Sequence, residues 1–258
     1  MANHIDLNFS SNSFCPIAKT VNKAGKCYHI SYGLRRMAIH LALYTPIHKG
    51  LRARLFRVST KAGTLDYADQ AALDAFYYEF EAVGAQMRLH HQWEERGLHP
   101  LLASEVPGCA EHLEEEHRKA HNRFDHLITH LDVTRKQSEP ENQRALGFEF
   151  YLALNRFIAF FLHHLDKEEE RAQPALWNLS TTEELTGAVQ TSFDVPPEQA
   201  KANLVMVIAA TNVEELVSLF AHMKESVPTA ALQNALNLAE RILNARDWET
   251  LKSRLESR

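Results

Sequence analysis

Cysteine is scarce in this chain of 258 residues, which contains only Cys15, Cys27 and Cys109. The three show no metal-knuckle spacing, and their odd number argues against a disulfide framework. Residues 1–14 also lack the basic start and apolar run of a signal peptide. We therefore expect a reducing, cytoplasmic location.

Long hydrophobic runs and blocks of basic charge are also missing. The longest apolar stretch, around 157–162, is far too short to cross a bilayer, so we expect no membrane partner. The net charge of −5 is spread over both signs, which argues against a nucleic-acid partner. With 45% hydrophobic and 24% charged residues, the composition is ordinary for a soluble globular protein.

Glycine and proline are scarce too, with nine of each, and long segments repeat with a helical period. The pattern predicts an all-α protein, an up-down-up-down four-helix bundle with an additional C-terminal helical region. The expected divisions are an N-terminal arm (1–31), the bundle (32–178) and a C-terminal extension (179–258). The expected bundle helices lie near 32–60, 68–103, 108–133 and 142–176.

The C-terminal extension should contain four or five shorter helices. Thr181 with Glu184, and Asn212 with Glu215, have the spacing of capping boxes. Proline pairs or single prolines predict further helix starts at 196–197 and 228. No cluster of polar residues falls on an apolar face there, so we expect this region to serve a protein partner or self-association rather than chemistry.

Polar residues interrupt the apolar stripe of each bundle helix. One unpaired buried polar group costs about 1–3 kcal/mol, and a buried carboxylate costs far more. Several together would exceed the ~5–15 kcal/mol net stability of a domain, so they must satisfy one another or bind something. The interrupting residues are His48, His90, Glu94, His117, His121, His164 and Glu168.

The spacing of these residues favours metal. Three pairs are four residues apart and so share a helix face, and His90–Glu94 repeats as His164–Glu168. Imidazoles and carboxylates without thiolates suit iron, manganese or zinc. Two ions sharing the carboxylates is the simplest use of seven ligands.

Other readings of these residues stay open. One alternative is that the seven form a hydrogen-bonded network, and a slip of one residue would select His91 and Glu95 instead. Tyr44 is either core or a hydrogen-bond donor to a metal-bound oxygen species. The remaining histidines of the bundle are expected to face solvent, to pack or to orient a ligand: His40, His99, His112, His126, His130 and His163.

Four motifs in order resemble the hemerythrin / HHE cation-binding family over residues 34–176. HHQWEERGLHPLL (90–102) is similar to the family's HxxxEExxLFPxL pattern. LEEEHRKAHNRFDHL (113–127) is similar to its HxxxH helix, and HHLDKEEERAQPAL (163–176) to its closing HxxxE pattern. PIHKGLRARLF (46–56) resembles the first helix, which carries a single histidine.

The resemblance implies a hemerythrin-like bundle with two non-haem iron ions, manganese or zinc being substitutes, joined by an oxo or hydroxo bridge. Glu94 and Glu168 would bridge the ions. The oxygen carriers of the family space the last pair one residue further, which would select Glu169. Besides these carboxylates, the ligands would be His117, His121 and His164 on one iron, and His48 and His90 on the other. Pro46, two residues before His48, should kink or interrupt the first helix.

An open position on the second iron would take dioxygen, nitric oxide or peroxide, so the resemblance implies a protein that binds or senses one of them. The alternatives are a di-iron oxidase or peroxide-degrading enzyme, and a metal-dependent adaptor that binds partners through 179–258. The carriers lack such an extension, which argues against simple oxygen transport.

Overall fold

The computed structural model describes residues 43–106, 108–190 and 196–257, and every regular element within them is a helix. The expected N-terminal arm and the expected first helical residues, 32–42, lie outside the described residues. An all-α fold is confirmed for the part of the chain that the structure describes.

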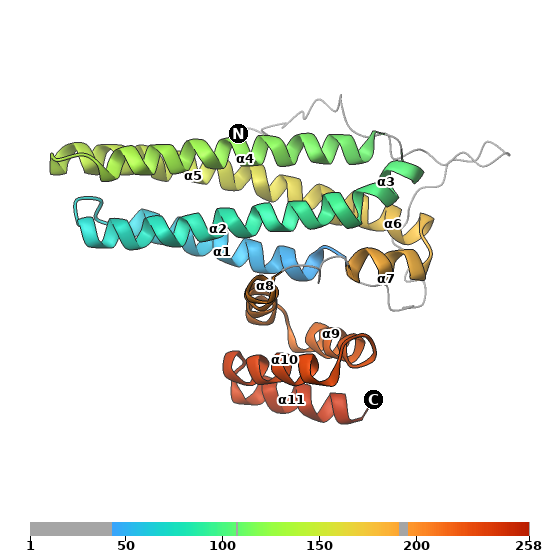
Figure 1. The fold of residues 1–258 in the computed structure, drawn as a ribbon. Coiled ribbons are helices and arrows are strands. Elements are labelled where there is room, and N and C mark those ends of the chain that lie inside the picture. Colours follow the sequence, from blue (N-terminus) through green and yellow to red (C-terminus); the bar gives the residue numbers. More distant parts are fainter. Residues whose placement is uncertain (1–42, 107, 191–195, 258) are drawn as a thin grey trace, which may run out of the picture.

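Four long antiparallel helices form the bundle (Figure 1). Each of them packs along two of the others, α1 against α2 and α5, and α4 against α2 and α5. Their inward stripes carry the apolar residues that the helical period predicts, and these form one buried cluster shared by all four helices. The helices are α1 (Thr45–Thr64), α2 (Gln70–Gly97), α4 (Cys109–Arg135) and α5 (Pro140–Lys167).

Two of the expected helices are divided near a proline. The second ends at Gly97 and continues as the short α3 (His99–Glu105), because Pro100 cannot donate a hydrogen bond within a helix interior. The fourth passes from α5 through a π-helical turn, η1 (Glu168–Ala172), into α6 (Gln173–Leu179). Both changes occur next to the predicted metal ligands.

Pro46 does not kink a longer helix within the described residues. The helix α1 begins at Thr45, so that Pro46 lies in its first turn. Backbone N–H groups of the first turn have no partner within a helix, and proline therefore costs nothing there. His48 follows within the same turn, and its backbone N–H donates to the carbonyl of Tyr44 at 3.1 Å.

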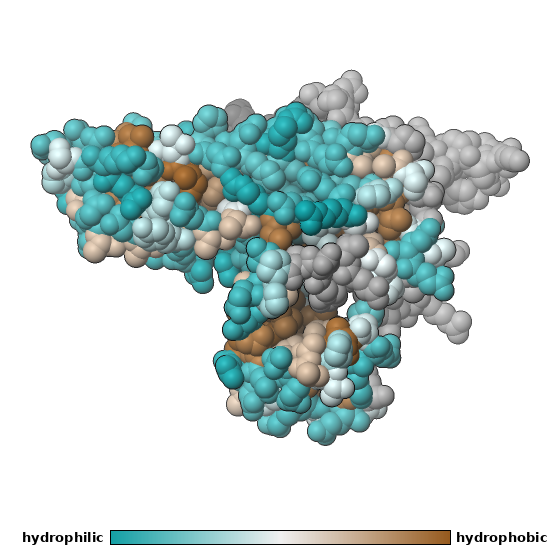
Figure 2. All heavy atoms as spheres, in the orientation of Figure 1, coloured by the Kyte–Doolittle hydropathy of each residue, from teal (hydrophilic) through white to brown (hydrophobic). Residues whose placement is uncertain are grey.

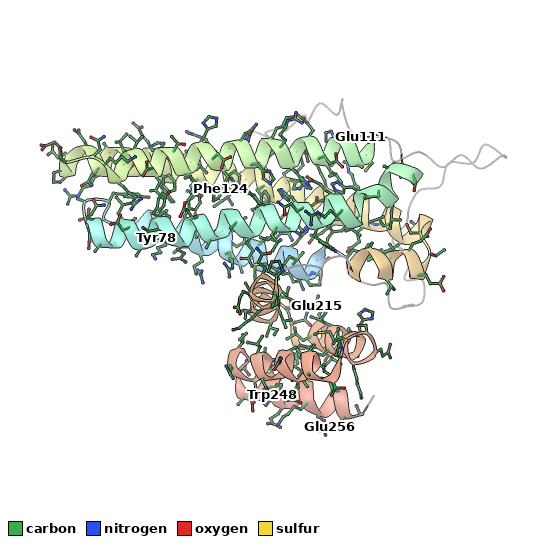
Figure 3. The ribbon with its side chains drawn as sticks, viewed as in Figure 1. Tyr78, Glu111, Phe124, Glu215, Trp248 and Glu256 are labelled. Carbon is green, nitrogen blue, oxygen red and sulfur yellow. The ribbon has the colours of Figure 1, made fainter. Side chains whose placement is uncertain are left out.

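The bundle is tight where α2 crosses α4. A Cβ atom built on Gly84 of α2 would lie 2.2 Å from the ring of Phe124 on α4. Phe124 is fully buried between the two helices (Figure 3) and stacks on Phe80 with ring centroids 4.4 Å apart. Only glycine leaves room for this ring.

The C-terminal region adds five helices to the described chain, and the last four share a core around Leu216, Val217 and Phe220. Both predicted capping boxes are confirmed. Asn212 and Glu215 cap each other's backbone N–H groups, as do Thr181 and Glu184. The helices are α7 (Thr182–Gln190), α8 (Pro197–Ala210), α9 (Val213–Ser226), α10 (Thr229–Ile242) and α11 (Ala245–Glu256).

The C-terminal helices are fixed to the side of the bundle through α8, which crosses α1 (Figure 1). Met206 of α8 fills the space left by Gly50 of α1, where a Cβ would meet its Cγ at 2.4 Å. Lys49 forms an ion pair with Glu215 of α9 at 2.6 Å. These contacts give α8–α10 a defined position against α1 and α2.

One helical rod, residues 140–178, is long and apolar enough to cross a membrane by length and composition alone. Its inward face, however, packs on α1 and α4 and carries His164 and Glu168. The core helix of a bundle passes the same test, so this finding is weak evidence for a membrane span.

Candidate metal centre

Six of the seven predicted ligands are brought together inside the bundle, at the end of it near α3 and α6. Each of the six has at most 3% of its surface exposed, although all of them are polar. His121, the seventh, is only partly buried and points elsewhere. The six are His48, His90, Glu94, His117, His164 and Glu168.

Glu94 lies between imidazoles from three helices. Its Oε1 is 2.9 Å from Nε2 of His90 and 3.7 Å from Nε2 of His48. Its Oε2 is 3.3 Å from Nε2 of His117. One carboxylate therefore faces a pair of imidazoles with one oxygen and another imidazole with the other.

Glu168 has the matching position on the opposite helix. Its Oε1 is 3.1 Å from Nε2 of His164 and 3.3 Å from Nε2 of His117. Its Oε2 is 3.3 Å from Nε2 of His48. Both carboxylates thus extend from a first pair of imidazoles, His48 and His90, to a second pair, His117 and His164.

Three of these imidazoles form a hydrogen bond to a further carboxylate through Nδ1, the ring nitrogen that faces away from the centre. A carboxylate only accepts hydrogen bonds, so each Nδ1–H donates and leaves Nε2 to face inward. His48 donates to Glu169 at 3.0 Å, and His117 donates to Glu95 at 2.9 Å. His164 donates to Glu116 at 3.1 Å. The outer acids therefore orient the rings.

The arrangement favours Glu168 over Glu169 as the acid that faces the centre. Glu168 is fully buried and faces the imidazoles, whereas Glu169 lies outside and accepts hydrogen bonds from His48 and Arg52. The π-helical turn begins at Glu168 itself. Such turns insert a residue without ending the helix and are frequent at functional sites, so both neighbouring acids reach useful positions.

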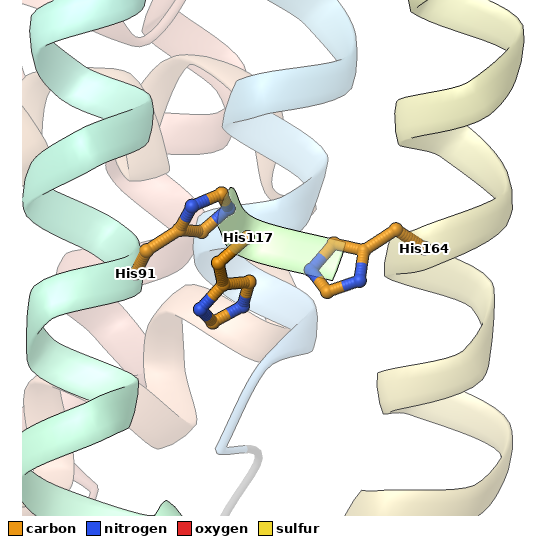
Figure 4. A group of neighbouring side chains, drawn as sticks. All are labelled: His91, His117 and His164. Atoms are coloured by element: carbon orange, nitrogen blue, oxygen red, sulfur yellow. The ribbon is translucent and has the colours of Figure 1, made fainter. Parts of the chain in front are cut away.

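The sequence offers His91 only as an alternative to His90 as a ligand, yet His91 is completely buried. Its ring stacks on His117 with centroids 3.7 Å apart, and its Nδ1 lies 2.9 Å from Nε2 of His121. His91, His117 and His164 point toward one another (Figure 4) and form one group that can hold an ion. His121 therefore contacts His91 and not the two carboxylates.

His99 is a second buried histidine that the periodicity did not single out. It belongs to α3, which begins after the break at Leu98, and it groups with Glu94, His117 and Glu168. Because this break changes the direction of the helix, stepping along α2 by three and four residues cannot place it. The sequence signal that could have located His99 is Pro100, which follows it directly and marks the break in the helix.

The buried atoms of the centre fit a cation better than they fit one another. Among the described residues, no hydrogen-bond partner is found for either oxygen of Glu94, for Oε2 of Glu168 or for Nε2 of His164, although each of these buried atoms lies close to an opposite group. The atoms are near but not aligned along donor–acceptor lines. Lone pairs directed at a shared central point are what a metal site requires.

The pKa values of the centre also indicate that it requires positive charge. Burial disfavours the charged form of His48, but the nearby carboxylates of Glu168, Glu169 and Glu94 outweigh it and raise its pKa to about 10. The same balance raises the pKa of His117 to about 11. Two acids in so small a space therefore demand positive charge, which protons or metal ions supply.

Tyr44, one turn before His48, is fully buried, and its hydroxyl has no hydrogen-bond partner among the described residues. Burial and the nearby charges of Glu94 and Glu168 raise its pKa well above the usual value. The hydroxyl therefore keeps its proton and remains a donor beside the carboxylates.

Assignment of the seven side chains as ligands stays a prediction, but the family can be stated. The chain matches no curated protein and no solved structure. A model of the Hemerythrin HHE cation binding domain matches residues 41–176, more than half of the chain and the whole of the described bundle up to α6. With its buried imidazoles and carboxylates, this protein belongs to the hemerythrin HHE cation-binding family.

Proposed function

We propose that the protein is a hemerythrin-like non-haem di-iron protein that binds or senses dioxygen, nitric oxide or peroxide. The observation that carries the proposal is the position of Glu94 and Glu168, each of which extends from one pair of imidazoles to the other. Two bridging carboxylates between two nitrogen pairs are a ligand set for two ions.

The described residues divide naturally between the two ions. His48 and His90 would hold one, His117 and His164 would hold the other, and the two carboxylates would be shared. When bound, the iron pair supplies reversible redox chemistry and an open position for a small molecule. The positions of these four imidazoles support this division, whereas His121 contacts His91 and lies away from the two carboxylates.

The chain itself supplies surroundings suited to a small bound molecule. The hydroxyl of Tyr44 keeps its proton and has no hydrogen-bond partner among the described residues. The ring of Phe161 lies 5.9 Å from that of His164, and Leu98 and Leu102 are buried in the same apolar cluster as Tyr44. A neutral donor in an apolar setting stabilises a polar guest by a hydrogen bond without offering free protons.

Metal analysis together with an optical spectrum tests the proposal. The purified protein should contain about two iron ions per chain and show charge-transfer absorption when oxidised. Adding dioxygen, peroxide or nitric oxide to the reduced protein should change that spectrum stoichiometrically. A protein that takes up one ion or none, or whose spectrum ignores all three molecules, would refute the proposal.

A second candidate function is an oxidase or a peroxide-degrading enzyme, which a large pocket beside His90 favours. A carrier or sensor needs only a small dry cavity, whereas an oxidase needs space for an organic substrate. Catalytic consumption of peroxide or dioxygen, far beyond one molecule per iron pair, would select the enzyme over the binding protein.

A further inference from the structure

A pocket of about 690 Å³ lies between the bundle and the C-terminal helices. Ile47 of α1 with Leu89 and Trp93 of α2 form one wall, and Leu204, Val207 and Leu238 of α8 and α10 face them. This volume falls in the range of sites for drug-sized organic molecules. Figure 2 shows hydrophobic surface on the C-terminal region where it faces the bundle.

His90 connects this pocket to the metal centre. Its Nε2 faces Glu94 and His48 inside the bundle, while the same ring lines the pocket. Its Nδ1 is buried without a hydrogen-bond partner among the described residues. It thus lacks the outer acid that the other three imidazoles possess, although its ring lines the pocket.

The charged residues around the pocket favour an anion. Lys201 of α8 and Arg241 of α10 line it, against the single acid Glu198. Neither cation forms an ion pair with a carboxylate of the described chain, whereas Lys49 and Arg52 on α1 both do. The remaining lining is mainly apolar, so the pocket suits a molecule with one acidic head and an apolar body.

We propose that the pocket binds an amphipathic carboxylate whose head accepts a hydrogen bond from Nδ1–H of His90 and whose apolar chain lies along α8 and α10. The bound carboxylate takes the place that Glu169, Glu95 and Glu116 have behind the other imidazoles. Its chain removes the apolar walls from water, and Lys201 and Arg241 attract its charge.

Binding at the pocket and metal at the centre should then influence each other. A carboxylate behind an imidazole fixes its tautomer and makes it a stronger ligand. By thermodynamic linkage, the metal must strengthen carboxylate binding by the same factor. This consequence depends on the proposed metal centre, whereas binding to the pocket does not.

Calorimetric titration of the full chain with dodecanoate tests the proposal, with dodecanol as the neutral probe of equal length. Dodecanoate should bind about ten-fold more tightly than dodecanol, because a hydrogen bond to a charged group exceeds one to a neutral group. Affinity should rise from octanoate to dodecanoate by up to about four-fold per methylene. Absence of binding, or equal affinity for acid and alcohol, would overturn the proposal.

Surface variants locate the site without disturbing the core. Ala231→Trp places a large ring in the pocket from an exposed position and should abolish binding. Arg241→Gln should weaken it by about two- to five-fold, as expected for an exposed charge. Arg246→Gln removes an exposed arginine outside the pocket lining and should have no effect. An intact affinity in Ala231→Trp would place the ligand elsewhere.

The same titration on metal-free and iron-loaded protein separates this inference from the proposed function. Tighter binding to the loaded protein, with a shifted absorption band, supports the contact at His90. Equal affinity in both forms overturns that contact. If the chain takes up no metal, the proposed function fails, and the preference for acid over alcohol still decides the pocket.

Discussion

At the scale of single residues, the inward direction of each ring decides what it can hold. Four imidazoles present Nε2 to Glu94 and Glu168, because outer acids or the helix position fix their rings. His121 has the same spacing on its helix but meets His91 instead. The difference arises because Ala120, not His121, occupies the buried stripe between His117 and Phe124.

Single substitutions of the two histidines on α4 separate the resemblance from the geometry. His117→Ala should lose at least about one of the two ions, because it removes an imidazole that faces both carboxylates. His121→Ala should keep nearly full metal content. Iron analysis of the two purified variants gives the answer, and equal loss in both would restore His121 to the ligand set.

Glu116 should matter for metal affinity although it faces outward from the ions. It accepts a hydrogen bond from His164 and forms an ion pair with Lys167. Burial opposes its charge, but His164 and Lys167 outweigh this and lower its pKa to about 2. Glu116→Gln should weaken metal binding by about 10- to 100-fold.

Competition with a chelator measures this effect. Glu115→Gln is the matched control, since it removes an acid from the next position on the same helix, one that pairs with Lys119. If both variants release metal equally, the orienting role of Glu116 is rejected.

At the scale of elements, the close crossing of α2 and α4 fixes the height at which the ligands meet. Phe124 lies against Gly84. Gly84 comes about 1.7 turns before His90 on α2, and Phe124 comes about two turns after His117 on α4. The same contact thus sets the relative positions of two ligand-bearing helices. A methyl group at residue 84 would force them apart.

Gly84→Ala should lower the free energy of unfolding by about 1–3 kcal/mol, because the added Cβ overlaps the ring of Phe124. Gly187→Ala in α7 is the control, since a Cβ there meets no described atom within 4 Å. That change should instead stabilise by up to about 1 kcal/mol through helix propensity. Denaturant unfolding of both variants checks the pair, and equal stability of the two would contradict the packing argument.

At the scale of the whole molecule, the charge of the metal centre couples stability to pH. In the metal-free protein the folded pKa values of His48 and His117 are raised to about 10 and about 11, against about 6.5 in the unfolded chain. Protons therefore stabilise the fold. This contribution is complete below about pH 6.5 and is lost as pH rises through the folded values.

Metal-free protein should consequently melt at lower temperatures as pH rises from about 7 to about 10. Iron-loaded protein should change less, because ions replace the two protons. The gap between the two melting temperatures should widen with pH. Thermal unfolding of both forms across this range is the measurement, and a constant gap would contradict the assigned pKa values.

The sequence by itself determined the helical fold, the apolar stripes and the fact that acids and imidazoles interrupt them. Those features depend on local spacing, since residues three and four apart share one helix face whatever the helix packs against. The internal repeat of His90–Glu94 as His164–Glu168 is visible in the sequence because each pair has the same local spacing of four residues. The capping boxes at 181–184 and 212–215 are also local.

Only the tertiary structure decided which of two adjacent or alternately spaced residues faces inward. A step of three or four residues is equally allowed by the period, so Ala120 rather than His121 was settled by the approach of α2 and α5 to α4. Breaks at Leu98 and Glu168 redirected His99 and Glu169. The pocket behind His90 depends on how α8 and α10 lie across α1 and α2, which is a contact between segments more than a hundred residues apart that no local pattern encodes.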